Sequence, residues 1–101
     1  DGMSCAITVP AKSANYTATL DDDTILVDAT SGTVTITLPA ASTATNKIYT
    51  VKKIDSSGNA VTVDPNAAET IDGASSKVLS AQWATSEIQC NGAAWFALAN
   101  I

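Results

Sequence analysis

The sequence predicts an all-β fold, an antiparallel β-sandwich or jelly-roll-like domain, from three observations. Threonine alternates with an aliphatic residue along residues 33–38, which is the two-residue period of a half-buried strand. Similar short apolar runs recur about every ten residues, separated by turn residues. No segment has the periodicity of an amphipathic helix.

The strand at residues 33–38 also predicts which side chains are buried. Val34, Ile36 and Leu38 share one face and are expected inside the subunit, and Pro39 ends the run. The threonines that alternate with them lie on the opposite face. We expect those threonines to face water or a neighbouring chain.

The remaining strands are placed by β-branched and aromatic residues that lie between turn signals. In chain order, we expect strands at residues 6–9, 16–20, 24–28, 33–38, 48–54, 60–64, 77–80, 83–90 and 95–99. Residues 40–45 are the best helical candidate. Their Ser and Thr content nevertheless favours a loop or a single turn.

The turn residues between these strands indicate hairpins. Ser31-Gly32 joins two strands, and residues 56–59 join two others, with Gly58 able to adopt a positive φ. Asn91-Gly92 lies between two apolar runs, which is the strongest short-range hairpin signal. We therefore expect an antiparallel meander.

Length and composition predict one domain with a thin core. The chain has 101 residues, of which 46% are hydrophobic but only 5% aromatic, so oligomerisation would add useful buried area. We divide it into an N-terminal segment, residues 1–14, and a β domain, residues 15–101. Asp1-Gly2 precedes Met3, so either a tag remnant comes before the native start or the chain is a piece of a longer protein.

Charge and residue types exclude several classes of function. The net charge is −5, and the basic surface that phosphate contacts need is missing, so nucleic-acid binding is not expected. No run approaches the ~20 apolar residues of a membrane span. Because histidine and arginine are absent, the usual general bases, nucleophile pairs and phosphate clamps are not available. We expect no enzyme, no catalytic residues and no cofactor.

Metal and disulfide chemistry has few candidates. Asp21–Asp23 could attract calcium, but a solvated turn explains this cluster as well, and the polar segment 55–59 lacks the later positions of a calcium loop. We therefore expect no metal site. Cys5 and Cys90 are a candidate disulfide, and the alternative is that both are small buried apolar residues. Lys52-Lys53 is expected at the surface, where it adds solubility or pairs with acidic turns.

Aromatic side chains supply the candidate ligand contacts. Flat rings suit the apolar C–H faces of sugars, so Trp83, Trp95 and Tyr49 are candidate contacts for a carbohydrate or receptor, although the core or a subunit interface is the usual place for such rings. Trp95 and Phe96 are adjacent on one strand and point to opposite faces. At least one of the two should therefore lie outside the main core.

Four phrases of the sequence resemble a β module of bacteriophage virion proteins. These phrases are TILVDATSGTVTITLPAA, KIYTVKKIDSSGNAVTVDP, ETIDGA and EIQCNGAAWFALA, and the resemblance covers residues 15–99. Modules of this kind are found in tail fibres, in other receptor-binding appendages and in capsid-surface proteins. They bring no catalytic residues to carry over.

The resemblance implies a non-enzymatic structural protein on the virion surface, of the tail-fibre or surface-appendage type, with a role in host attachment. It further implies a homotrimer that contacts other virion proteins and host surface polysaccharide. Two alternatives remain open. One is a capsid decoration (cement) protein, and the other is a carbohydrate-binding module of a bacterial surface protein.

Overall fold

The structure, a computed structural model, describes residues 7–100, and its regular elements are strands apart from one short turn of helix. The strands are β1 (Ile7–Lys12), β2 (Tyr16–Thr17), β3 (Thr24–Val27), β4 (Val34–Thr37), β5 (Ile48–Lys53), β6 (Val61–Asp64), β7 (Lys77–Leu79), β8 (Thr85–Cys90) and β9 (Trp95–Asn100). A 3₁₀ turn, η1 (Ala41–Thr43), lies between β4 and β5, as a loop or single turn was expected there. Within residues 7–100, no helix is long and apolar enough to cross a membrane. The all-β prediction is confirmed.

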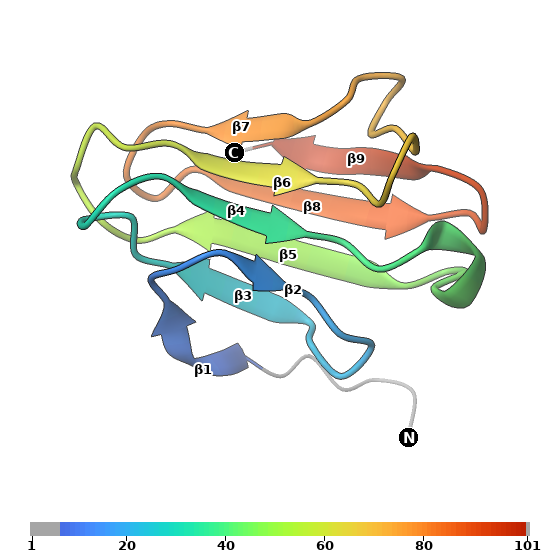
Figure 1. The fold of residues 1–101 in the computed structure, drawn as a ribbon, viewed down its shortest axis with the longest axis horizontal. Helices are drawn as coiled ribbons and strands as arrows, with labels where there is room; N and C mark the ends of the chain where they lie inside the picture. The colour runs from blue at the N-terminus through green and yellow to red at the C-terminus, as the bar shows by residue number, and fades with distance from the viewer. Residues whose placement is uncertain (1–6, 101) are drawn as a thin grey trace.

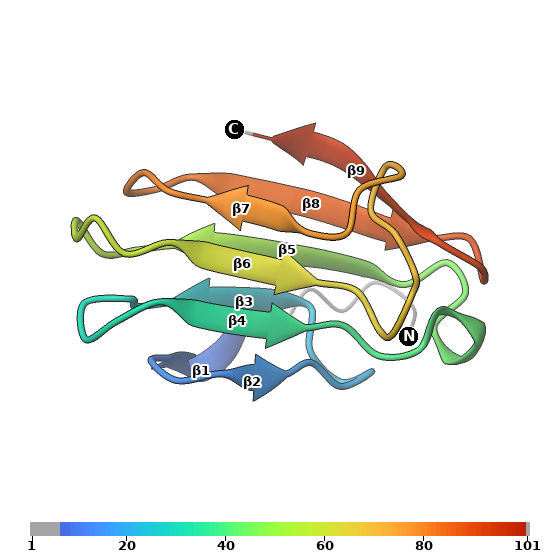
Figure 2. The same ribbon diagram turned by 45° about the horizontal axis from the view of Figure 1, so that its top comes forward.

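The strands form two mixed sheets that lie in two layers (Figures 1 and 2). One sheet has five strands in the order β1-β3-β5-β8-β9, and the other has four in the order β2-β4-β6-β7. From β1 to β6, successive strands alternate between the two sheets. Each pass through both sheets is one coil, and successive coils stack along the molecule (Figure 2).

The expected antiparallel arrangement is wrong for the coiled part of the domain. The pairs β1–β3, β3–β5, β2–β4 and β4–β6 are parallel, and only the pairs that involve β7, β8 or β9 are antiparallel. The turns at Ser31-Gly32 and at residues 54–60 carry the chain across to the facing sheet, whereas a hairpin would return it beside the preceding strand. The chain therefore re-enters each sheet one coil later in the same direction.

Stacking of the coils places like side chains above one another. Ile25 lies opposite Val51 in the first sheet, and Ile36 lies opposite Val63 in the second. These side chains fill the space between the two layers, where β-branched residues pack well on a pleated surface. The inward apolar row is therefore continuous from one coil to the next.

The core draws apolar side chains from both sheets and from the turns between them. Its members are Ala18, Ile25, Val27, Ala29, Val34, Ile36, Leu38, Ala41, Ala44, Tyr49, Val51, Val61, Val63, Ile71, Leu79, Ile88, Cys90 and Trp95. The prediction that Val34, Ile36 and Leu38 are buried is confirmed, since none exposes more than 1% of its surface. Thr35 and Thr37 lie on the outer face and are half-buried.

Two of the predicted turns have different outcomes. Asn91-Gly92 joins the neighbouring antiparallel strands β8 and β9, and Gly92 has φ +96°, so this hairpin is confirmed. Gly58 does not have a positive φ, because the segment around it is a crossing between sheets.

The N-terminal segment 1–14 contributes a strand to the five-stranded sheet. Its strand β1 pairs in parallel with β3 at the edge of that sheet.

Candidate functional site

Two of the three aromatic residues considered as sugar contacts lie in the core. Tyr49 and Trp95 are both 0% exposed, and their ring centroids are 5.7 Å apart. The Tyr49 hydroxyl donates to the carbonyl of Thr19 at 2.7 Å, and burial raises the pKa of Tyr49. Neither ring presents a face to a ligand, so we do not place a sugar contact on either.

Trp83 is the one of the three that solvent reaches. It is 56% exposed in the turn before β8, and its backbone has φ +71°. The ammonium of Lys52 lies 5.8 Å from the centre of its ring and donates to the Trp83 carbonyl at 3.1 Å. Trp83 therefore remains a candidate contact residue, held against β5 by a lysine.

The cysteine pair falls partly outside the described residues. Cys5 precedes residue 7, so the proposed disulfide lies outside the part of the chain that the structure describes. Cys90 ends β8 in the core, where its sulfur donates to the Ala41 carbonyl at 3.3 Å and accepts from the Gly92 N–H at 3.2 Å. Its thiol thus joins η1 to the β8–β9 turn.

Lys53 is buried, and the expectation of a surface lysine pair is wrong at this position. Its side chain is 0% exposed, and its ammonium donates to Asp55 Oδ2 at 2.7 Å and to the Ser57 carbonyl at 3.0 Å. Lys53 follows the inward parity of Tyr49 and Val51, so the strand directs it inside. Lys52, one position earlier, faces outward as expected.

The Asp55 carboxylate links two stacked turns. Its Oδ1 accepts from the backbone N–H of Ala29 at 2.7 Å, and the Asn59 side chain donates to the Ala29 carbonyl at 2.8 Å. Burial opposes the ionisation of Asp55. The hydrogen bonds from Lys53, Ser57 and the Ala29 N–H outweigh that effect, so the pKa of Asp55 is lowered. This cluster holds one coil on the next.

In the acidic run Asp21–Asp23, the side chains of Asp22 and Asp23 stabilise the fold through hydrogen bonds and an ion pair. Asp22 is buried and accepts from Thr8, from the Tyr16 hydroxyl at 2.6 Å and from the Thr19 N–H at 2.9 Å. Asp23 forms an ion pair with Lys47 at 2.6 Å. Among residues 7–100, no three His, Cys, Asp or Glu side chains are placed to hold a metal ion.

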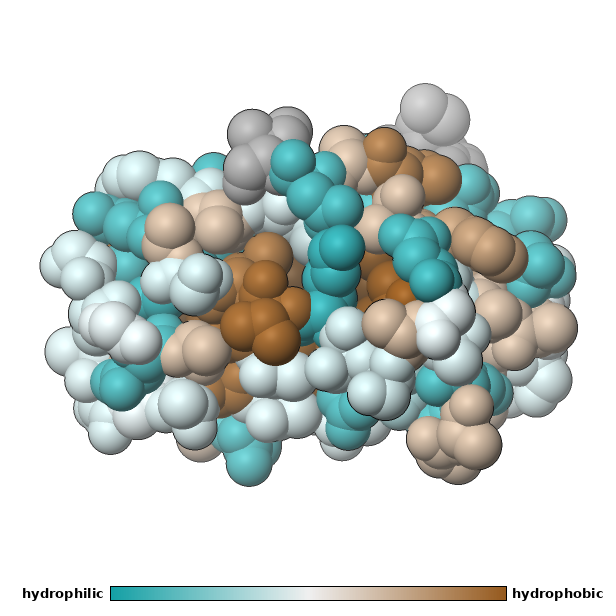
Figure 3. Space-filling model, turned by 90° about the horizontal axis from the view of Figure 1, so that it is seen from above, coloured by the Kyte–Doolittle hydropathy of each residue, from teal (hydrophilic) through white to brown (hydrophobic). Residues whose placement is uncertain are grey.

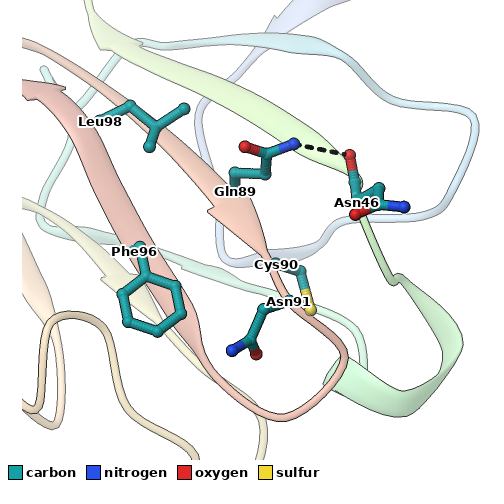
Figure 4. A pocket seen from close by; sticks show the side chains of 6 residues that line it. All are labelled: Asn46, Gln89, Cys90, Asn91, Phe96 and Leu98. Carbon is teal, nitrogen blue, oxygen red and sulfur yellow. Dashed lines mark hydrogen bonds between the residues drawn. The ribbon is translucent and has the colours of Figure 1, made fainter.

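A surface hollow at the end of the five-stranded sheet is a further candidate site (Figure 4). Its volume is about 260 Å³, and the residues that line it are Asn46, Gln89, Cys90, Asn91, Phe96 and Leu98. Gln89 and Phe96 lie opposite each other on β8 and β9 and share the outer face of the sheet. Phe96 is 42% exposed and Leu98 is 52% exposed. Trp95 points inward and Phe96 outward, as their adjacent positions predict.

The two amides of the hollow are held in fixed orientations. Asn91 Oδ1 accepts from the N–H groups of Ala93 and Ala94, both at 2.9 Å, and Gln89 Nε2 donates to the Asn46 carbonyl at 3.3 Å. These bonds leave Asn91 Nδ2 as a donor and Gln89 Oε1 as an acceptor. In Figure 4 Gln89 Oε1 points toward Leu98, whereas Asn91 Nδ2 lies at the other end of the hollow, on the side of Phe96.

Sequence reasoning identified Asn91 as a turn residue and Phe96 as the outward partner of Trp95, but it did not bring these residues together as a site. The hydrogen bonds of Asn91 and the register of Phe96 against Gln89 depend on the hairpin geometry.

A scan against protein-family models found no match to this chain, and a search of curated proteins found none either.

Proposed function

We propose that this protein is a non-enzymatic structural module of a bacteriophage appendage, of the tail-fibre or surface type, that acts in host attachment. The single observation that supports this proposal best is the stack of coils. In β3, β4, β5 and β6 each strand pairs on both sides, and the turns between coils are cross-linked through Asp55 and Asn59. Such a module is a stiff support that presents its end turns and outer faces to other molecules.

We further propose that the domain is a two-layer β-sandwich that assembles as a homotrimer. Figure 3 views the end of the stack at which β7 and β9 lie, and it shows two groups of hydrophobic side chains on either side of a strip of hydrophilic ones. On these two strands the exposed large apolar residues are Val78, on the outer face of the four-stranded sheet, and Phe96 and Leu98, on the outer face of the five-stranded sheet. Exposed apolar side chains on a domain with a thin core favour burial against another subunit.

The proposal is tested by two measurements on the whole chain. Light scattering at micromolar concentration should return the mass of a trimer, and a monomer mass would reject the assembly. Fluorescently labelled protein should bind the surface of some strains in a panel of bacteria, as counted by flow cytometry. Binding to none of them would reject the attachment role.

Capsid decoration is the second candidate function, since a small, rigid β domain also suits a cement protein. The two roles differ in their target. A decoration protein should sediment with expanded capsids and leave bacterial cells unlabelled, whereas an attachment module should do the reverse.

A further inference from the structure

Exposed apolar side chains gather on one face of the domain. On the outer face of the five-stranded sheet the exposed large hydrophobic residues are Ile7, Val9, Ile48, Phe96 and Leu98. On the strands of the four-stranded sheet, within residues 7–100, Val78 alone is of this kind, and Thr62 and Thr35 follow it across that sheet. Single apolar residues are normal on a surface, whereas gathered ones mark a contact. The five-stranded sheet therefore carries the better candidate for a contact face.

The first group of these residues, the β1 patch, consists of Ile7 and Val9. Ile7 pairs with Thr24, which faces outward because its neighbour Ile25 is buried, and Val9 follows Ile7 by two positions. Their exposed fractions are 53% and 78%. No residue of β1 belongs to the core, so the apolar character of the β1 patch has no role inside the subunit.

The second group, the β9 patch, consists of Phe96, Leu98 and Ile48. Ile48 and Phe96 lie in one row across the sheet, on either side of Gln89, and Leu98 follows Phe96 on the same face. β1 and β9 are the two outer strands of the sheet and lie at opposite ends of the stack (Figure 2). With three strands between them, at about 4.8 Å per step, the two margins are roughly 19 Å apart. One chain therefore presents two separate apolar patches on one face.

We propose that the β1 patch of one copy packs on the β9 patch of the next, and that three copies close into a ring in this way. The inference rests on the proposed homotrimer and adds which surfaces meet in it. Every contact in a ring is heterologous, so each subunit must supply two different patches, as this chain does. The contact removes apolar surface from water on both partners, which stabilises the assembly.

The charges between the two patches favour a ring over a face-to-face pair. Lys52 and Glu87 lie on the outer face of β5 and β8, between the two margins. A two-fold pair with the sheets stacked face to face would also bring unlike patches together. That pair would bury both charges, and charged residues are depleted in the middle of interfaces because their desolvation is costly. In a ring the margins touch, and the middle of each sheet faces a solvated central axis.

The edges of the sheet favour contact through side chains over the addition of a strand. Pro10 has no N–H to donate at the β1 edge, and the register of β1 on β3 is interrupted between Thr8 and Lys12. At the other margin, the Asp72 carboxylate accepts from the Ala97 N–H of β9. The partner therefore meets the apolar faces of these strands.

A cross-linking experiment tests the pairing in the whole chain. In a Cys5→Ser background, Val9→Cys and Leu98→Cys are made singly and together and are treated with a short bismaleimide; Cys90 is buried. The double variant should give a covalent trimer under denaturing conditions, and each single variant should stay a monomer. A covalent dimer or a longer polymer as the end product of the double variant, a dimer from either single variant, or no linked species would overturn the proposal.

Charge substitutions give an independent test. Val9→Lys and Leu98→Asp each place a charge in the contact, and each should return the monomer mass in light scattering at micromolar concentration. The chain that carries both should recover the trimer mass, because a lysine of one copy then faces an aspartate of the next. A trimer in either single variant would overturn the proposal. A double variant that stays monomeric would assign the two losses to separate contacts and overturn the pairing.

The matched control is Val78→Asp, on the outer face of the opposite sheet, and it should keep the trimer mass. Because Val9, Leu98 and Val78 are all more than half exposed, each variant should keep the melting temperature of a folded chain under conditions where it is monomeric or trimeric alike. A monomer mass for a folded Val78→Asp chain would place the contact on the four-stranded sheet and overturn the proposal.

Failure of this pairing can be told apart from failure of the proposed function. If the unaltered chain has the mass of a trimer but the cross-links do not form as expected, the assembly stands and the pairing is rejected. If the unaltered chain has the mass of a monomer, the assembly and the pairing are both rejected. The attachment role is judged separately by the labelling of bacterial cells.

Discussion

The ammonium of Lys53 lies 2.7 Å from the carboxylate of Asp55 in a site that solvent barely reaches, with side-chain exposures of 0% and 5%. The same carboxylate accepts the backbone N–H of Ala29 from the adjacent coil. The ion pair therefore orders the turn after β5 and fixes that turn to the adjacent turn, which joins β3 to β4. Both functions proposed for this module depend on a stiff stack of coils. The ion pair therefore contributes to the stability of the domain and holds its turns in a fixed position.

Replacing Lys53 tests the contribution of this pair. Lys53→Met leaves the Asp55 carboxylate in its enclosed site without a cation, and we expect the free energy of unfolding to fall by about 3 kcal/mol. Urea denaturation measures this change. Lys52→Met is the matched control, because that neighbour faces outward and should change stability by less than about 1 kcal/mol. Equal losses in the two variants would contradict the structural role of Lys53.

Stability should fall in acid because of Asp22 and Asp55. Burial opposes ionisation of both, but hydrogen bonds outweigh it and the pKa of each carboxyl is lowered in the folded state. A folded pKa below the unfolded value, about 4 for Asp, stabilises the protein above that value, and the contribution is lost as the pH falls through the folded pKa. The melting temperature should therefore be level near pH 6 and decline below about pH 4.

The same pH series on a variant identifies the groups responsible. Asp22→Asn keeps an oxygen that can accept from the Thr19 N–H but cannot ionise, so the decline in melting temperature below about pH 4 should be shallower than in the unaltered chain. Asp21→Asn changes an exposed neighbour and serves as the control. An unchanged acid slope in Asp22→Asn would remove Asp22 from this explanation.

Gly92 should resist substitution, whereas Gly58 should not. Gly92 has φ +96°, and an added Cβ would lie 2.9 Å from Thr45 Oγ1, so Gly92→Ala should cost about 1 to 3 kcal/mol. Gly58 lacks a positive φ, and an added Cβ would meet no atom within 4 Å. Gly58→Ala should be neutral or stabilise by up to about 1 kcal/mol. Thermal melts of both variants measure the difference, and a larger loss in Gly58→Ala would contradict it.

Alternation in the sequence predicts the strands and their buried faces but does not predict their partners. A period of two fixes the face of each side chain, and either a parallel or an antiparallel neighbour satisfies it. The informative signal is an internal repeat, since residues 24–32 and 50–58 both pass from a strand through an Asp to a Ser-Gly turn. The parallel register of Thr24 on Thr50 is the structural form of that repeat.

The candidate site was harder to predict than the fold for a related reason. The sequence could have predicted that Lys53 is buried. It lies on the same face of β5 as Val51, and Asp55, two residues later, supplies a carboxylate to pair with it. No comparable rule joins Asn91 to Phe96. Their common hollow arises from the tight β8–β9 turn and the register across it, which depend on three-dimensional geometry.

The outer edge of β9 is covered by the segment that leads to β7, and Asp72 completes this cover. The backbone N–H of Trp95 donates to the Thr70 carbonyl at 2.9 Å, and the Asp72 N–H donates to the Trp95 carbonyl at 3.0 Å. Asp72 Oδ1 accepts from the Ala97 N–H at 3.1 Å. An open edge with exposed apolar neighbours is a template for pairing with another chain. Asp72 therefore protects β9 from uncontrolled association.

Removing this carboxylate should increase self-association more than it reduces stability. Asp72 has φ +52°, so Asp72→Gly deletes the acceptor without backbone strain, whereas Asp72→Asn retains an oxygen for the Ala97 N–H. We expect Asp72→Gly to form species larger than the native assembly on concentration, as followed by light scattering, while Asp72→Asn behaves as the unaltered chain does. If both variants remain at the native mass in conditions where each is fully folded, the Asp72 carboxylate does not prevent β9 from pairing with another chain. In that case the Thr70 and Asp72 backbone contacts alone would be enough to keep β9 from pairing.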